Sequence, residues 1–155
     1  MADLSIREGQ AAEIAALEFA IPEFRQPKSL DVLEARLRPE RDALILLACS
    51  DGTPVGFKAG YALAPGTFYS WVGAVLPAFR GQGVARRLLQ AQEARLRGRA
   101  YARIRVKSRN AFPGMLRLLV AEGYRIVGLE AVPSAEDPKI VFEKALSAAK
   151  DGTSL

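Results

Sequence analysis

The chain has 155 residues, half of them apolar, which is enough for one hydrophobic core and gives no reason to expect a second domain. Its longest apolar run, residues 43–49, has seven residues, far fewer than the roughly 20 that a membrane-spanning helix needs. The first ten residues carry no apolar stretch and Cys49 is the single cysteine, so we expect no secretory signal, no internal disulfide and a cytoplasmic protein.

The formal net charge of +5 is unevenly spread. Residues 80–109 contain nine arginines and one lysine against a single acid, Glu93, and so carry +9, which leaves −4 for the rest of the chain. A basic block of this kind either faces a polyanion or forms a solvated surface.

Apolar periodicity in the first half of the chain predicts a strand, two helices and three strands. Ser29 can cap the second helix, and Pro39 ends it. The turn pairs Asp51-Gly52 and Pro65-Gly66 join the three strands into antiparallel hairpins. These elements lie at residues 4–7, 11–19, 30–38, 44–49, 54–63 and 67–75.

The second half predicts a helix, a strand, another helix and two closing strands. A leucine-rich stripe marks the buried face of the long first helix, and Gly98 is predicted to stop it. Pro113 suits the first turn of the next helix, and Gly123 ends it. These elements lie at residues 84–97, 101–107, 113–122, 125–130 and 140–143.

This order is typical of an α/β protein in which layers of helices flank a mixed, mostly antiparallel central sheet. Residues 1–145 are predicted to form a single domain, and residues 146–155 a polar C-terminal tail.

The turn before the long helix carries two glycines, Gly81 and Gly83. The first N–H groups of a helix have no acceptor within the helix and lie at the positive end of its dipole, and glycine lets an anion approach the backbone closely. Arg80, Arg86 and Arg87 stand at the same end, where cations are disfavoured by roughly 0.3–1 kcal/mol each unless an anion is bound. The sequence therefore predicts an anion site here.

Three kinds of loop can be compared with this turn. A P-loop needs G-x-x-x-x-G-K-[ST], which the chain lacks. A dinucleotide fingerprint needs a third glycine where the chain has Arg86, and an acid about 20 residues further on, where it has Arg103. The pattern R-x-x-G-x-A after V-x-P is met by Arg80, Gly83 and Ala85, and here the chain resembles the pyrophosphate loop of the GNAT acetyltransferases. A tight turn that uses glycine for its geometry alone is the alternative.

The resemblance covers the chain from the opening strand to Ile140 and implies the GNAT fold, with the fourth and fifth strands of the sheet splayed apart. It implies that the pantetheine arm of acetyl-CoA bonds the exposed strand edge near Val75, and that the pyrophosphate meets the backbone N–H groups of residues 82–86. Asn110 matches an asparagine that contacts the arm, although it could also be an ordinary turn residue. The cofactor-binding residues implied in this way are Val75, Arg80, Gly81, Gln82, Gly83, Val84, Ala85, Arg86 and Asn110.

Acetyl transfer to an amine needs a base, because only the neutral amine attacks a thioester. The chain has no histidine, so carboxylates are the candidates. In the GNAT fold the link between the first two helices lines the acceptor pocket, which makes Glu23 the first candidate and Glu18 the second, although each could equally be a solvated acid. Tyr69 stands where some GNAT enzymes keep a catalytic glutamate, so it either binds a water or the acceptor, or packs as an ordinary aromatic residue. No metal is implied.

Many GNAT enzymes carry a tyrosine four residues before the glycine matched by Gly123, and its hydroxyl protonates the departing thiolate. This chain has Leu119 there. Thiols have a pKa near 8.5, so a water is expected to suffice as proton donor. Tyr124 is expected to pack, and Cys49, in an apolar run without a histidine to activate it, is expected to be a buried structural thiol.

The implied function is direct transfer of the acetyl group from acetyl-CoA to an amine, with a small molecule or an amino acid favoured over a protein. A catalytically silent acyl-CoA sensor remains open because of Leu119. A nucleic-acid binder fits the pI near 9.7 but is disfavoured, because Tyr101 alone interleaves the arginines. A homodimer through the closing strands is implied by resemblance, and no membrane partner is expected. Six aromatic residues could either form the acceptor pocket or fill the core: Phe24, Phe57, Tyr61, Phe68, Tyr69 and Trp71.

Overall fold

A computed structural model of the protein describes residues 3–131 and 137–146. Its helices are α1 (Ala11–Ala20), α2 (Leu30–Arg36), α3 (Val84–Gly98) and α4 (Pro113–Ala121), with short 3-10 turns at Pro39–Arg41 and Pro77–Phe79. Its strands are β1 (Leu4–Glu8), β2 (Leu44–Ser50), β3 (Thr53–Ala64), β4 (Thr67–Val75), β5 (Arg103–Ser108), β6 (Arg125–Glu130) and β7 (Lys139–Ala145). The element order predicted from periodicity is confirmed.

All seven strands form one sheet in the order β1-β2-β3-β4-β5-β7-β6. Every neighbouring pair is antiparallel except β4 and β5, which are parallel. The mixed, mostly antiparallel sheet flanked by helices is therefore confirmed.

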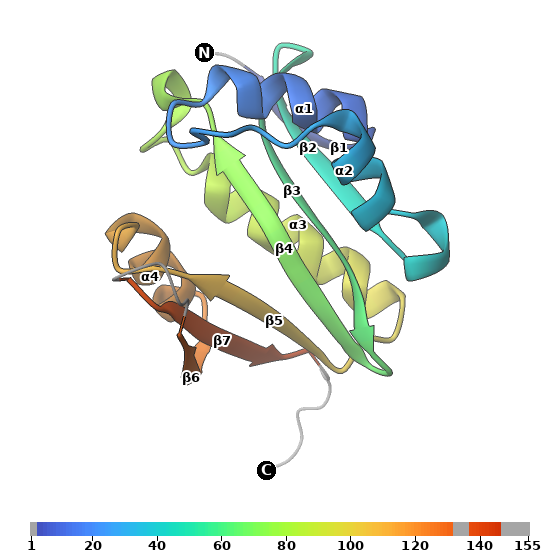
Figure 1. The fold of residues 1–155 in the computed structure, drawn as a ribbon, viewed down its shortest axis with the longest axis vertical. Coiled ribbons are helices and arrows are strands. Elements are labelled where there is room, and N and C mark those ends of the chain that lie inside the picture. Colours follow the sequence, from blue (N-terminus) through green and yellow to red (C-terminus); the bar gives the residue numbers. More distant parts are fainter. Residues whose placement is uncertain (1–2, 132–136, 147–155) are drawn as a thin grey trace.

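The strands β4 and β5 pair over a short stretch and then diverge. Their register runs from Thr67 opposite Arg103 to Ser70 opposite Val106, although β4 continues to Val75. Figure 1 shows the two strands separating, β4 in green and β5 in gold. The splayed fourth and fifth strands are confirmed, and the edge of β4 beyond Ser70 has no partner in β5.

An irregularity in β4 lies next to the point of divergence. Ala59 pairs with Val72 and Tyr61 pairs with Tyr69, so three steps along β4 match two along β3, which is the signature of a bulge. Gly60 permits it, because a Cβ at this position would lie 2.0 Å from the carbonyl oxygen of Tyr69.

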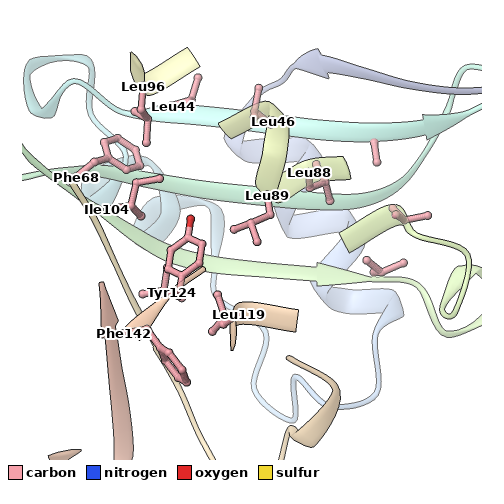
Figure 2. Close-up of a cluster of buried hydrophobic side chains, with 14 of the residues drawn as sticks. Leu44, Leu46, Phe68, Leu88, Leu89, Leu96, Ile104, Leu119, Tyr124 and Phe142 are labelled. Atoms are coloured by element: carbon pink, nitrogen blue, oxygen red, sulfur yellow. The ribbon is translucent and has the colours of Figure 1, made fainter. Parts of the chain in front are cut away.

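The sheet divides the core into two layers. On one face α1 and α2 cover a cluster that includes Ile14, Leu33 and Phe57. On the other face α3 and α4 cover a larger cluster that includes Leu88 and Leu119. Figure 1 places α1 and α2 in front of the sheet and α3 behind it, and Figure 2 shows the larger cluster. Cys49 is buried in the α1 and α2 layer, as predicted.

Three local predictions are corrected. Gly98 is the last residue of α3 and does not reverse the chain: the left-handed residue is Ala100, with φ of 64°, and the closing bond runs from the Tyr101 amide to the Leu96 carbonyl. Helical spacing predicts Val120 in the buried stripe of α4, but its side chain is 59% exposed. Leu146 is buried in the core, although it was assigned to the polar tail, whose residues 147–155 lie outside the described residues.

Two absences apply to the described residues. None of their helices is both long enough and apolar enough to cross a membrane. Across residues 3–131 and 137–146, no three side chains of the His, Cys, Asp and Glu types are grouped so that they could hold a metal ion.

Candidate active site

A cleft of about 720 Å³ opens where β4 and β5 diverge. Its walls come from β4, from the turn before α3, from the first turns of α3 and α4, and from the link between α1 and α2. Residues as far apart in the sequence as Ile21 and Lys139 therefore share one depression, and nine of the eleven predicted site residues line it. These nine are Glu23, Tyr69, Val75, Arg80, Gly81, Gly83, Val84, Ala85 and Arg86.

The turn at one end of the cleft leaves backbone amides unpaired. The first bond of α3 runs from the Arg87 amide to the Gly83 carbonyl, 3.0 Å, so the amides of Val84, Ala85 and Arg86 have no acceptor within the helix. Gly83, the N-cap residue, has a φ of 82° and offers no side chain to cap them. Because no atom lies within 4 Å of the place where its Cβ would stand, an anion could approach these amides directly.

The open edge of β4 faces the same cleft. The Leu76 amide bonds the Val55 carbonyl of β3, at 2.8 Å, so the peptide groups of Val75, one residue earlier, face away from β3. By the same alternation the peptide groups of Gly73 face away from β3. An extended ligand with amide groups could therefore bond this edge as an additional strand would.

The three arginines near the turn have protein partners, which corrects the expectation that they require a bound anion. Arg86 pairs with Glu122 at 2.9 Å, and Arg87 donates to the Leu4 carbonyl at 3.0 Å. Arg80 binds Glu23. The prediction of an anion site now rests on the unpaired amides and not on excess positive charge.

The Arg80–Glu23 pair links the two ends of the predicted site. The guanidinium donates to both carboxylate oxygens, at 2.8 and 3.0 Å, and its Nε donates to the Val75 carbonyl at 3.0 Å. The hydrogen bond from Arg80 holds the pKa of Glu23 below its usual value. Both side chains remain nearly half exposed, so the contact lies at the mouth of the cleft. Glu23 is thus ionised and close to the site, but its basicity is reduced.

Glu18, the second candidate base, is enclosed. It is fully buried and accepts hydrogen bonds from the amide of Lys28 at 2.9 Å and from its ammonium group at 3.2 Å. This pair ties the link between α1 and α2 back onto α1. Glu18 is not among the residues that line the cleft, so it holds the link between α1 and α2 in place without facing the cleft.

Aromatic side chains form the wall on the α1 and α2 side. Phe24, Phe57, Tyr69 and Trp71 line the cleft, whereas Phe68 points to the opposite face and is buried in the larger core cluster. The Lys28 ammonium lies 5.2 Å from the ring centroids of both Phe24 and Trp71. Burial raises the pKa of Tyr69, which keeps its hydroxyl protonated. The sequence left open whether these aromatic residues form a pocket or a core, and the structure divides them between the two.

Two predicted cofactor residues and the position of the expected general acid lie off the cleft wall. The Asn110 amide group donates to Asp137 at 3.0 Å, and the Gln82 side chain donates to the Ala78 carbonyl at 3.3 Å. Leu119 is fully buried in the core. The contact of Asn110 with the cofactor arm stays a prediction.

Sequence reasoning missed Lys58. It lies in the middle of β3, is only 6% exposed and lines the cleft. Burial lowers its pKa to about 8, although the nearby charge of Glu93 acts in the opposite direction. The sequence does carry a signal for this burial, because Lys58 stands between Phe57 and Ala59 inside a long apolar strand. Side chains alternate between the two faces of a strand, so a strand that is apolar on both sides of Lys58 predicts that both faces, and the lysine with them, are buried.

The basic block is largely neutralised by acids, six from other segments and one, Glu93, from the block itself. Seven of its ten cations form ion pairs with carboxylates: Arg80, Arg86, Arg95, Arg97, Arg99, Arg105 and Lys107. The segment therefore presents far less net charge than its sequence suggests.

Comparison with known proteins agrees with this geometry. Residues 11–125 match the sequence model of the acetyltransferase (GNAT) family. No curated protein matches the chain by sequence.

Several solved structures share the fold. The ribosomal-protein-S18-alanine N-acetyltransferase of Escherichia coli superposes with a TM-score of 0.82 at 17% identity, covering 99% of this chain and 100% of its own. An aminoglycoside 6'-N-acetyltransferase complexed with coenzyme A gives 0.78 at 16% identity, with 95% and 99% covered. The yncA protein of Salmonella typhimurium, with its cofactor acetyl-CoA, gives 0.75 at 17% identity, with 97% and 99% covered.

At these identities the structural likeness shows a shared fold, while the family match extends over well more than half of the chain. The protein therefore belongs to the GNAT family of acetyltransferases and is an N-acyltransferase.

Proposed function

We propose that the protein transfers the acetyl group of acetyl-CoA directly to a primary amine on a small molecule or an amino acid. The observation that carries the proposal is the continuity of two backbone features in one cleft: the unpaired amides at the start of α3 and the unpaired edge of β4. A diphosphate fits the first, and an extended chain with amide groups fits the second.

The length of the β4 edge supports this fit. The pantetheine arm has twelve bonds between the phosphate oxygen and the sulfur, as many as four residues of backbone, and spans roughly 13 Å when extended. Four residues of strand separate Val75, next to the turn, from Trp71, next to the point where β4 and β5 meet. A donor anchored by Gly81 and Gly83 would therefore present its thioester near the vertex of the cleft, beside the aromatic wall.

The residues that hold the donor are those predicted from the turn. The amides of residues 82–86 would receive the diphosphate, and the β4 edge from Gly73 to Val75 would bond the arm. When bound, acetyl-CoA supplies an activated acyl group. Backbone N–H groups at the β4 edge would stabilise the negative charge that develops on the carbonyl oxygen, because they are fixed before the reaction begins.

The acceptor would approach from the α1 and α2 side. We propose Glu23 as the group that removes its proton, through a water molecule, and Tyr69 as a group that orients that water or the amine. The lowered pKa of Glu23 keeps it ionised and able to accept a proton, and loosening its contact with Arg80 would raise its basicity. The aromatic wall with Lys28 beside it favours a compact acceptor with an apolar or aromatic part.

The test is a panel of amines, amino acids and peptides incubated with acetyl-CoA, with coenzyme A release followed in time. We expect turnover with a subset of the small amines. Release that requires a peptide N-terminus would refute the acceptor class, and no binding of coenzyme A or acetyl-CoA would refute the donor.

A further inference from the structure

The side of the cleft that faces α3 contains one buried ionisable side chain. Leu88, Val106, Met115 and Leu118 make most of this side apolar. Among the described residues that line the cleft, Lys58 is the one ionisable residue that is buried. Burying a cation in an apolar wall lowers the stability of the fold unless a partner compensates the lost hydration. A buried cation without a partner is therefore a candidate for a functional role.

The path of the Lys58 side chain leads under β4. Lys58 pairs with Gly73, and its Cγ lies 3.3 Å from the place where a Cβ of Gly73 would stand. Glycine at position 73 therefore leaves room for the lysine stem to pass beneath the strand. Gly73 lies three residues beyond Ser70, where β4 and β5 part, and two residues before Val75. Lys58 thus passes below Gly73, two residues from Trp71, beside which the thioester would lie in the proposed function.

Two buried polar side chains on the neighbouring elements β4 and α3 lack partners in the part of the chain that the structure describes. Ser70 Oγ and both polar atoms of the Gln92 side chain are buried and have no hydrogen-bond partner among the described residues. Gln92 lies one helical turn from Leu88, which contacts the Cβ position of Gly56 on β3. It also lies one turn from Leu96, which belongs with Phe68 of β4 to the larger core cluster, so α3 carries Gln92 across the face of the sheet that holds Lys58. Each unsatisfied group costs about 1–3 kcal/mol, which indicates that a water or a ligand completes this cluster.

The acid behind Lys58 is already engaged. Glu93 accepts from the Tyr124 hydroxyl at 2.8 Å and from the Lys144 ammonium at 3.0 Å, and Arg97 lies 3.8 Å away. Lys58 forms no hydrogen bond or ion pair with any residue that the structure describes. Its ammonium group is thus left available to a group entering the cleft.

We propose that Lys58 donates the proton that the departing coenzyme A sulfur receives, with Ser70 and Gln92 positioning the ammonium group through water. The inference rests on the proposed donor. The amine nitrogen forms a bond to the carbonyl carbon, the C–S bond breaks with its electron pair going to sulfur, and a proton moves from the Lys58 Nζ to that sulfur. The neutral Lys58 then regains a proton from solvent. The acceptor amine loses one proton to Glu23 through water, and this proton returns to solvent, so the number of protons is unchanged overall.

The acidity of the two groups suits this transfer. Burial lowers the pKa of Lys58 to about 8, and a thiol has a pKa of about 8.5, so moving the proton to the thiolate is nearly neutral in free energy. Among the charged and titratable groups on the neighbouring elements, Glu93 of α3 favours the ammonium form of Lys58. Its carboxylate also accepts hydrogen bonds from Lys144 of β7 and from Tyr124, which weakens this effect. Leu119 supplies no proton in this arrangement.

The first test measures binding and needs no acceptor. The pKa of the coenzyme A thiol is measured in the complex by ultraviolet absorbance of the thiolate, with desulfo-coenzyme A as the blank. We expect the positive charge at position 58 to lower the thiol pKa in the native protein and in Lys58→Arg, and we expect a return to about 8.5 or above in Lys58→Met. Lys58→Met should fold at least as well as the native chain, because it removes an unpaired buried charge.

The second test separates proton donation from charge alone. With any amine that turns over, Lys58→Met should lower kcat by roughly 100-fold with little change in the Kd for acetyl-CoA, and should abolish the loss of kcat at high pH. Lys58→Arg keeps the charge but holds its proton, so kcat should fall while the thiol pKa stays low. Equal thiol pKa values in native protein and Lys58→Met, or equal kcat–pH profiles, would overturn the role of Lys58 and leave the proposed function intact. Absence of coenzyme A binding would overturn both.

Discussion

Replacement of Gly83 by aspartate tests the anion site without dismantling the fold. Gly83 has a φ of 82°, and an L residue there is strained by roughly 1–2 kcal/mol, but aspartate is among the side chains that best tolerate this conformation. Its carboxylate would also lie at the positive end of α3, which is worth roughly 0.3–1 kcal/mol in return. A net strain of at most about 1.7 kcal/mol lowers the melting temperature by roughly 2–4 °C per kcal/mol in a chain of this size, so we expect Gly83→Asp to lose no more than about 7 °C.

The effect on the donor should be much larger. Two unit charges 4 Å apart repel by about 4 kcal/mol at an effective dielectric of 20, and a third of that value already corresponds to a tenfold change in Kd. Titration calorimetry with acetyl-CoA should thus show a Kd raised by well over tenfold in Gly83→Asp.

Gly66 offers the matched control. It has a φ of 77° and an open Cβ position whose nearest neighbour is the Ala102 Cβ at 3.7 Å, and it lies in the turn before β4, away from the cleft. Gly66→Asp should show a similar backbone strain and an unchanged Kd. Native affinity in Gly83→Asp, or equal losses in the two variants, would refute the assignment of the diphosphate to this turn.

Three further outcomes follow from the contacts. Arg80→Ala should return the lowered pKa of Glu23 toward its usual value, so the acid limb of the kcat/KM profile should move to higher pH, and an unmoved limb would argue against Glu23 as the base. The Arg80–Glu23 ion pair stabilises the fold at pH values above the ordinary carboxyl pKa, and this stabilisation is lost as the pH falls through the lowered pKa of Glu23. Because both side chains are nearly half exposed, the change in unfolding midpoint should be small. Gly60→Ala should destabilise the fold by at least about 3 kcal/mol in denaturant titrations, because its Cβ would meet the Tyr69 carbonyl at 2.0 Å, whereas Gly128→Ala, with open space, should be nearly neutral. Cys49→Ala should lose about 1 kcal/mol of stability and keep its turnover, and loss of turnover with intact folding and donor affinity would contradict direct transfer.

Much of the fold could be predicted from the sequence because it depends on local properties. Strand alternation, helical spacing and turn residues gave the element order, and the signature around Arg80 and Gly83 located the turn where α3 begins. The left-handed conformations of Gly81 and Gly83 follow from the same local preference for glycine. The position of Ala100 shows the limit of this reasoning, since a helix end was placed at the nearest glycine while the chain reversed two residues later.

The functions of individual side chains at the site were decided by partners distant in sequence. Three arginines that read as unmatched cations are bound by Glu23, by Glu122 and by the Leu4 carbonyl, and none of these partners lies within the segment that suggested an anion.

The family signature, the order of elements and the turn with free amides all follow from the amino-acid sequence, because backbone conformation and periodicity are set by neighbours along the chain. Packing in three dimensions opens Lys58 to the cleft, encloses Leu119 in the core and brings Arg80 to Glu23. The burial of a side chain and its hydrogen-bond partners depend on how segments far apart in the chain pack against one sheet. The alternation of residues along a strand does not show which elements will cover its two faces.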